Sequence, residues 1–299
     1  MVSSPYGYRL SSLPFWSCSI ALQRPATLSH LMIRPDAATY QALVESSFLR
    51  EEFAWTEDRT TVANQNRSWR GLYLYGENNY FEFLDPVTTP WSSPDGIAFG
   101  VNEPGAGREI QGRLQTQLER EVGYWPRTRV YDGREVPWFD YIGYNQGDEP
   151  LWSWVMEFHP DFLKAWHPEL PPSEGGITHR AVLTRYRATL GERDTSAPRY
   201  FKDVTEVMLA LPPEVALRLA QKVATYGYTV AQNEQGLRCE GPTDRLFILP
   251  ATPSYSGIIA FKMALHRNKP AQTLYRFGSQ STLMFHNDQT ATWMLRGDF

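Results

Sequence analysis

The chain has 299 residues, of which 42% are hydrophobic and 14% aromatic, so it can form one large or two medium domains around a sizeable core. Its 29 basic and 33 acidic residues give a net charge of −4 and form no dense run of either sign, which excludes a nucleic-acid footprint and a polybasic membrane anchor. We therefore expect no nucleic-acid and no membrane partner, and instead a small-molecule substrate or another protein, a homodimer included.

The N-terminal residues and the two cysteines bear on the cellular compartment. Residues 13–22 are apolar but interrupted by polar side chains, and they lack a convincing cleavage site and the ~20 apolar residues of a membrane span. We interpret residues 1–25 as a poorly ordered or loosely docked N-terminal extension. Cys18 and Cys239 are too far apart in sequence to suggest a disulfide framework or a CxxC metal site, which favours a reducing, cytoplasmic compartment.

A first structural unit is predicted from about residue 27 to residue 86. Pro35 closes a short apolar strand, and Asp36 follows it as a candidate N-cap of a helix of roughly three turns. In chain order, the unit contains a strand at 28–33, a helix with apolar residues at 40, 43, 44 and 48, strands at 53–62 and 69–75, a turn at 64–66 between these two, and a last strand that bears Glu82. The predicted order is β-α-β-β-β.

A second copy of this unit is predicted to begin at Gly96. The apolar residues of its helix recur every four positions and end at Gly123, which is typical of one helical stripe with a glycine C-cap. Its members are a strand at 96–101, a helix with Ile110, Leu114, Leu118 and Val122, and strands at 128–131, 138–144 and 151–158. The order is again β-α-β-β-β, and the last strand again bears a glutamate, Glu157.

The rest of the chain divides into a connector and two further units. A strand at 204–209 and a helix beginning at Pro212–Pro213 open the third unit, and a strand at 257–262 opens a shortened fourth unit. Neither unit has a glutamate where Glu82 and Glu157 stand. The predicted domains are an N-terminal domain at 26–160 with the candidate site, a helical connector at 161–199, and a degenerate C-terminal domain at 200–299.

Glu82 and Glu157 each lie inside an otherwise apolar, aromatic strand. Burying an ionised carboxylate without a partner costs several kcal/mol, so such a group is usually paired, neutralised or bound to a metal. Glu82 has an alternative partner in Arg70 or Arg127, and Glu157 has one in the helix that begins after Pro160. Taken together, the two strands predict a polar site inside a β-rich core.

The repeated β-α-β-β-β units, with a histidine in the first strand and a glutamate in the last, resemble the vicinal oxygen chelate superfamily, which includes glyoxalase I, extradiol dioxygenases and bleomycin-resistance proteins. The resemblance covers most of residues 27–299. It implies an α+β fold in which the units pair into two glyoxalase-like modules of curved sheets. Residues 72–76 with 80–83, then 96–101 and 154–160, are similar to a group of poorly characterised, glyoxalase-like bacterial proteins.

In this superfamily the first and last strands of each unit supply up to four metal ligands. The resemblance therefore implies that His30, Glu82 and Glu157 hold a divalent metal ion, with Zn²⁺, Ni²⁺, Mn²⁺ or Fe²⁺ all suited to mixed N and O ligands. A fourth ligand is missing, because the first strand of the second unit offers only Gly96 or Ile97. His159, two residues after Glu157, is a candidate substitute ligand or general base, with capping of the next helix as its structural alternative.

Four further residues are candidate substrate contacts. Trp154, Trp138 and Tyr141 alternate in strands that line or back the expected cleft, although aromatic residues at this period usually belong to the core. Arg127 is a candidate contact for an anionic substrate, with surface solvation as its alternative.

The function we predict from these features is that of a metal-dependent enzyme acting on a small, oxygen-rich molecule. Chelation by the metal polarises the substrate while Glu157 or His159 moves a proton, which favours isomerase or lyase chemistry. Three alternatives are a metal-free protein that binds or sequesters a small molecule, an iron-dependent oxygenase, and a protein-interaction module. The oxygenase is disfavoured because the two-histidine, one-carboxylate ligand set is not met.

Overall fold

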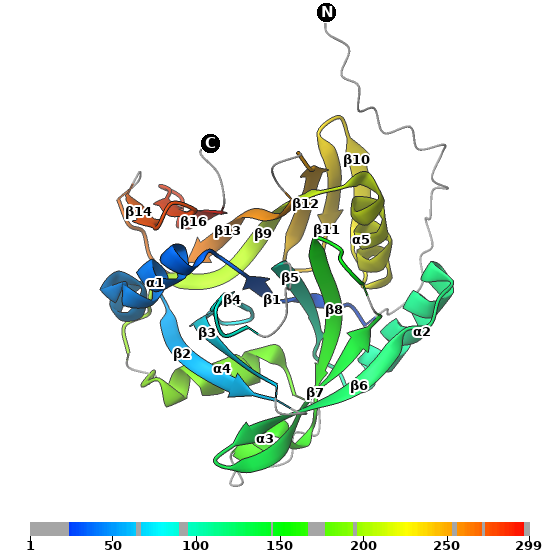
Figure 1. Ribbon diagram of the computed structural model, residues 1–299, viewed down its shortest axis with the longest axis horizontal. Helices are drawn as coiled ribbons and strands as arrows, with labels where there is room; N and C mark the ends of the chain where they lie inside the picture. The colour runs from blue at the N-terminus through cyan, green and yellow to red at the C-terminus, as the bar shows by residue number, and fades with distance from the viewer. Residues whose placement is uncertain are drawn as a thin grey trace, which may run out of the picture.

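A computed structural model describes residues 24–63, 67–89, 95–144, 146–166, 177–193, 196–252, 256–270 and 273–295. The predicted extension at 1–25 lies outside these ranges except for its last two residues, and so does the predicted turn at 64–66. The described residues form a mixed α+β fold of two eight-stranded, curled sheets and a few helices (Figure 1). This arrangement is consistent with two paired-sheet modules.

The first sheet is built from the N-terminal half of the chain. Its strands are β1 (Thr27–Ile33), β2 (Trp55–Val62), β3 (Ser68–Tyr75), β4 (Tyr80–Leu84), β5 (Asp95–Val101), β6 (Gly123–Tyr131), β7 (Arg134–Gly143) and β8 (Leu151–Phe158). They are ordered β2-β3-β4-β1-β5-β8-β7-β6, so β1 and β5 lie side by side at the centre and run antiparallel. Each of these two strands also pairs in parallel with a strand later in the chain, β1 with β4 and β5 with β8.

The first sheet curls until its two ends meet. Ala63, just after β2, forms an antiparallel bridge with Arg129 of β6, although these strands stand at opposite ends of the strand order. The sheet therefore has a concave face inside the curl and a convex face outside it (Figure 1).

The second sheet is built from the C-terminal part of the chain. Its strands are β9 (Phe201–Leu211), β10 (Thr229–Asn233), β11 (Gly236–Glu240), β12 (Arg245–Pro250), β13 (Gly257–Leu265), β14 (Leu274–Phe277), β15 (Ser281–Phe285) and β16 (Thr290–Leu295). They are ordered β10-β11-β12-β9-β13-β16-β15-β14. Between β13 and β14 the described residues contain no helix, which agrees with the shortened fourth unit expected from the sequence.

The helices are α1 (Ala37–Glu45), the π-helix η1 (Leu49–Phe53), α2 (Ala106–Leu118), α3 (Asp161–Trp166), α4 (His179–Thr189) and α5 (Pro213–Thr225). Asp36 caps α1 as the sequence predicted, since its carboxylate accepts a hydrogen bond from the backbone N of Thr39 at 2.8 Å. Helix α2 ends four residues before the predicted Val122, because Glu119 adopts a left-handed conformation with φ of 48°. None of the described helices is long and apolar enough to cross a membrane.

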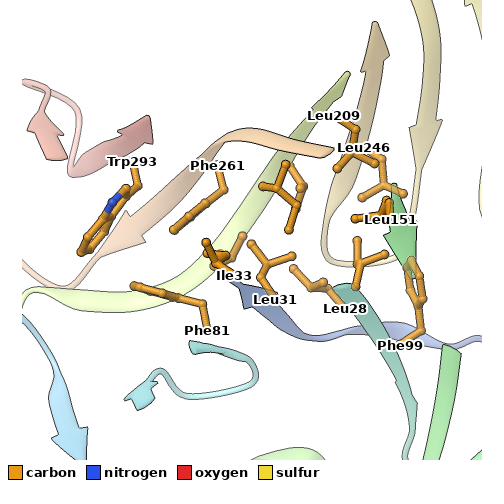
Figure 2. Close-up of a cluster of buried hydrophobic side chains, with 14 of the residues drawn as sticks. Leu28, Leu31, Ile33, Phe81, Phe99, Leu151, Leu209, Leu246, Phe261 and Trp293 are labelled. Atoms are coloured by element: carbon orange, nitrogen blue, oxygen red, sulfur yellow. The ribbon is translucent and has the colours of Figure 1, made fainter. Parts of the chain in front are cut away.

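The main hydrophobic core lies between the two sheets (Figure 2). Phe81 of β4 packs against Phe261 and Trp293 of the second sheet, with ring centroids 4.9 and 5.3 Å apart. Alternate residues of β1, Leu31 and Ile33, belong to the same core. Each large apolar side chain buried here contributes about 1.5–3 kcal/mol, so this core fixes which residues of β1 and β4 face away from it.

A second, smaller cluster of buried hydrophobic residues lines the concave face of the first sheet. Helix α4 contributes Val182, Leu183 and Tyr186, which pack with strand residues such as Tyr75. The rings of Tyr75 and Tyr186 stack with centroids 4.9 Å apart. The connector thus covers the concave face of the first sheet, as the position of α4 in Figure 1 shows.

Candidate functional site

His30 and Glu82 meet on the concave face of the first sheet. In β1, Leu31 and Ile33 pack in the core between the sheets, so His30 and Met32 face the opposite way. Glu82 in β4 lies between two phenylalanines of that core and faces the same side as His30. The gap between His30 Nε2 and Glu82 Oε1 is 3.8 Å, and each residue is only 6% exposed.

A chain of two contacts, from Met156 through Ser29, leads to the Nδ1 edge of the His30 ring. A register shift between Leu28 and His30 places the neighbouring residues Ser29 and His30 on the same side of the sheet. Ser29 Oγ lies 3.1 Å from His30 Nδ1 and donates its hydrogen to Met156 Sδ at 3.3 Å. In the tautomer that carries its hydrogen on Nδ1, His30 donates to the Ser29 hydroxyl, the hydroxyl donates to the sulfur, and His30 Nε2 presents a lone pair toward Glu82.

Two aromatic rings enclose His30. Tyr80 stacks on it with centroids 4.5 Å apart, and Trp154 meets it edge-on at 5.5 Å. Burial, with a smaller contribution from His179, lowers the pKa of His30 from 6.5 to about 3. The imidazole is therefore neutral at physiological pH, the form that can act as a metal ligand or hydrogen-bond acceptor.

The carboxyl group of Glu82 titrates close to neutral pH. Burial raises the pKa of Glu82 from 4.5 to about 7, while a hydrogen bond from the Tyr73 hydroxyl and the charge of Arg59 act in the opposite direction. Tyr73 in turn accepts a hydrogen bond from Trp69 Nε1 at 3.1 Å, and Arg59 Cζ lies 4.3 Å from the centre of its ring. A buried carboxyl with such a pKa and fixed partners is suited to general acid–base chemistry.

The central strand β5 carries only small residues on the concave face. Ile97 and Phe99 belong to the core between the sheets, so Gly96, Ala98 and Gly100 face the site. Ala98 lies directly across from His30 in the antiparallel pairing. The strand pairing therefore places Ala98, and not Gly96 or Ile97, across from His30, and the alanine side chain has no donor atom.

Glu157 does not join His30 and Glu82. Its carboxylate accepts hydrogen bonds from the backbone N of Gly105 at 2.6 Å and of Gly107 at 2.9 Å, and thereby caps the N-terminus of α2 on the convex side. Capping had been an alternative in the sequence, but at the helix after Pro160 and not at α2. We therefore leave Glu157 out of the candidate site.

A difference of one residue in register explains the position of Glu157. Glu82 pairs with Met32 between β4 and β1, and the corresponding pairing between β8 and β5 joins Met156 to Gly100. Met156 therefore stands in β8 where Glu82 stands in β4. Because side chains alternate along a strand, Glu157 faces the other side of the sheet.

His159, predicted as a catalytic residue, lies at the surface just after β8. Its Nδ1 accepts a hydrogen bond from the backbone N of Asp161 at 3.1 Å, and its own backbone N donates to the carbonyl of Trp138 at 3.0 Å. The side chain is 37% exposed. The structure thus places His159 at the start of α3, in the capping position considered as its alternative.

Three of the four predicted substrate contacts form a series that leads away from His30. Trp154 touches His30, Tyr141 stacks on Trp154 with centroids 6.0 Å apart, and Arg127 Cζ lies 5.3 Å from the Tyr141 ring centre. Trp138 is in another contact, since it stacks on Trp69 with ring centroids 6.5 Å apart. Of the four, only Trp154 is in direct contact with the His30–Glu82 pair.

Several residues of the site were not found from the sequence: Ser29, Tyr73, Tyr80, Arg59 and His179. The sequence pattern could have indicated Tyr80, which lies two residues before Glu82 in β4, and Tyr73, which pairs with Glu82 from the adjacent strand β3. Ser29 reaches the site only through the register shift of β1. His179 comes from the connector, where no strand pattern marks it.

The comparisons with known proteins place the chain in a family. A family model described as "Family of unknown function (DUF5829)" matches residues 28–295. No curated protein matches the chain. Among solved structures, a hypothetical protein from Staphylococcus aureus aligns with a TM-score of 0.46 and 13% identity over 77% of this chain and 87% of that chain. A xylose isomerase-like TIM barrel/4-hydroxyphenylpyruvate dioxygenase fusion protein aligns with a TM-score of 0.42 and 11% identity over 84% of this chain and 37% of that chain. Since the family model spans nearly all of both sheets, the chain belongs to the DUF5829 family.

Proposed function

We propose that the protein is a metal-dependent enzyme with a glyoxalase-like fold that acts on a small, oxygen-rich molecule at the His30–Glu82 pair, by isomerase or lyase chemistry. The observation that carries the proposal is the 3.8 Å gap between His30 Nε2 and Glu82 Oε1, two buried donors on one face of the sheet. The strand order around β1 and β5 is compatible with the paired-sheet fold that the resemblance implies.

His30 and Glu82 are spaced to share one divalent metal ion, although within the described residues no third His, Cys, Asp or Glu joins them. Metal–ligand bonds from His and Glu are about 2.0–2.2 Å long, so a gap of 3.8 Å is within the span of two such bonds. When the proton of His30 is on Nδ1, the Ser29 hydroxyl accepts it and Nε2 is free to bind, as in metal sites where the other ring nitrogen of a ligating histidine donates to a neighbouring group. A bound cation would supply Lewis-acid polarisation of the substrate oxygens.

The proton transfer is assigned to Glu82. Without a metal ion, burial raises its pKa to about 7, and a bound cation would lower this pKa and favour the carboxylate, the form that accepts a proton. The carboxylate has two oxygens, so one can contact a cation while the other accepts a proton from the substrate. Tyr73 donates to this carboxylate and holds it in place, and Tyr80 and Trp154 form the walls that exclude water.

A second candidate is a metal-free protein that binds or sequesters a small molecule in the same place. It is favoured by the position of Glu157, which leaves two of the three predicted ligands on the concave face. In this reading Glu82 is protonated below its pKa and hydrogen-bonds the ligand directly, while the aromatic walls provide most of the contact area.

Calorimetric titration of the chelator-treated protein with Zn²⁺ distinguishes the two functions. The enzyme proposal predicts about one strong site per chain, which Glu82→Gln weakens at least tenfold. Glu157→Gln is the matched control, since it changes the other strand glutamate to the same amide and should leave Zn²⁺ binding unchanged. Equal binding by the native protein and by Glu82→Gln would contradict the proposal.

A further inference from the structure

We propose that His179 is a further substrate-binding residue of the His30–Glu82 site and that its Nε2 accepts a hydrogen bond from a hydroxyl group of the substrate. This inference rests on the proposed function and adds a substrate class to it. The substrate would carry chelating oxygens at one end and a hydroxyl at the other.

The first step of the argument is where His179 lies. It is the first residue of α4, and its ring stands directly on Gly100 of β5, where an added Cβ would lie 1.9 Å from His179 Cε1. Gly100 is two residues from Ala98, the partner of His30 across the strands. Two residues of a strand span about 7 Å, so His179 and His30 stand on one face of the sheet, about the length of a small molecule apart.

The second step concerns hydrogen bonds. Asn102 Oδ1 accepts a hydrogen bond from the backbone N of His179 at 2.9 Å and lies 3.4 Å from His179 Nδ1. A carbonyl oxygen only accepts, so the hydrogen of the neutral ring sits on Nδ1 and Nε2 has a lone pair. Within the described part of the chain Nε2 has no hydrogen-bond partner, although His179 is only 5% exposed. A buried acceptor without a donor is unfavourable, and a ligand hydroxyl would satisfy it.

The third step selects the kind of group that binds. Burial lowers the pKa of His179 to about 4, so the ring is neutral at physiological pH and does not attract an anion. Nε2 as a bare acceptor selects a donor such as a hydroxyl.

The connector therefore supplies a polar group where β5 supplies none. Gly100 corresponds in the strand pairing to Met32, and a side chain of any size at this position would exclude the His179 ring. The position of the His179 ring therefore requires glycine at residue 100.

Binding of hydroxamates to the Zn²⁺-loaded protein tests the inference. Propano-, butano- and pentanohydroxamate chelate metal ions through two oxygens and have no further donor on their chains. The matching compounds with a hydroxyl on the last carbon, 3-hydroxypropano-, 4-hydroxybutano- and 5-hydroxypentanohydroxamate, add one donor at increasing distance from the metal. We expect at least one hydroxylated analogue to bind about fivefold more tightly than the unsubstituted hydroxamate of equal length. The gain should persist in His179→Gln, which keeps an acceptor near the position of Nε2, and vanish in His179→Leu.

The controls separate this inference from the proposed function. Unsubstituted butanohydroxamate should bind equally to the native protein and both His179 variants, and thermal unfolding should show that all three are folded. If it binds but no terminal hydroxyl improves affinity, or if His179→Leu keeps the gain, the role of His179 is wrong and the proposed function stands. If no hydroxamate binds the native protein and no Zn²⁺ is bound, the proposed function is wrong and the inference falls with it.

Discussion

Met156 and Glu157 are neighbours in β8, yet their side chains lie on opposite faces of the first sheet. Met156 belongs to the cluster on the concave face, and Glu157 binds the N-terminus of α2 on the convex side. Two glutamates that look equivalent in the sequence therefore have different roles. Glu82 belongs to the candidate site, and Glu157 stabilises the packing of α2 against the sheet.

The capping role of Glu157 predicts a loss of stability without a loss of binding. Glu157→Gln removes the charge that accepts two backbone N–H groups, which should lower the free energy of unfolding by about 1–2 kcal/mol. Urea denaturation monitored by circular dichroism measures this change. A stability equal to that of the native protein would show that the cap contributes nothing.

The close contact between Gly100 and His179 predicts strong coupling between these positions. Gly100→Ala should destabilise the protein by about 1–3 kcal/mol, because the new methyl group would overlap the His179 ring. In a His179→Ala background the same substitution should have little effect, since the ring is gone. A double-mutant cycle by chemical denaturation measures the coupling, and additive effects would contradict the contact.

Glu82 predicts a specific dependence of stability on pH. Its folded-state pKa of about 7 is above the unfolded value of 4.5, so the folded state binds more protons than the unfolded state in this window. The contribution of Glu82 is therefore fully present below about pH 4.5 and is lost as the pH rises to 7, with a total of about 3 kcal/mol. Relative to the native protein, Glu82→Gln should gain stability between pH 5 and pH 8. If the free energies of unfolding of the native protein and of Glu82→Gln changed in parallel with pH, the pKa of the Glu82 carboxyl would be the same in the folded and unfolded states.

The Ser29–Met156 contact predicts the tautomer of His30. ¹⁵N chemical shifts from long-range ¹H–¹⁵N spectra should show a neutral ring protonated on Nδ1 down to about pH 4, because burial lowers the pKa of His30 to about 3. Ser29→Ala should remove the preference for this tautomer and weaken Zn²⁺ binding. Protonation of Nε2 in the native, metal-free protein would contradict the assigned hydrogen bonds.

Much of the fold was readable from the sequence, because local patterns determine it. Asp36 predicted the start of α1, and the four-residue period through Ile110 and Leu114 predicted α2. The alternation of apolar residues around Glu82 predicted β4. Each of these features depends on neighbouring residues only. The mixed α+β class follows from the same signals.

The candidate site was readable only in part, because it depends on register and on contacts between distant segments. Nothing local shows whether Met156 or Glu157 faces His30, since one residue of register decides it. His179 lies 79 positions from Gly100 and reaches it only after the connector folds back on the sheet. The tautomer of His30 likewise depends on a sulfur atom in β8, which no pattern in β1 reveals.

The location of a bound metal ion tests the central claim most directly. Crystals of the protein grown with Mn²⁺ should show one anomalous scattering peak between His30 Nε2 and Glu82 Oε1, within about 2.3 Å of each atom. The same crystals of Glu82→Gln should lack the peak, and those of Glu157→Gln should retain it. A peak at Glu157, or none near His30 at saturating Mn²⁺, would contradict the account.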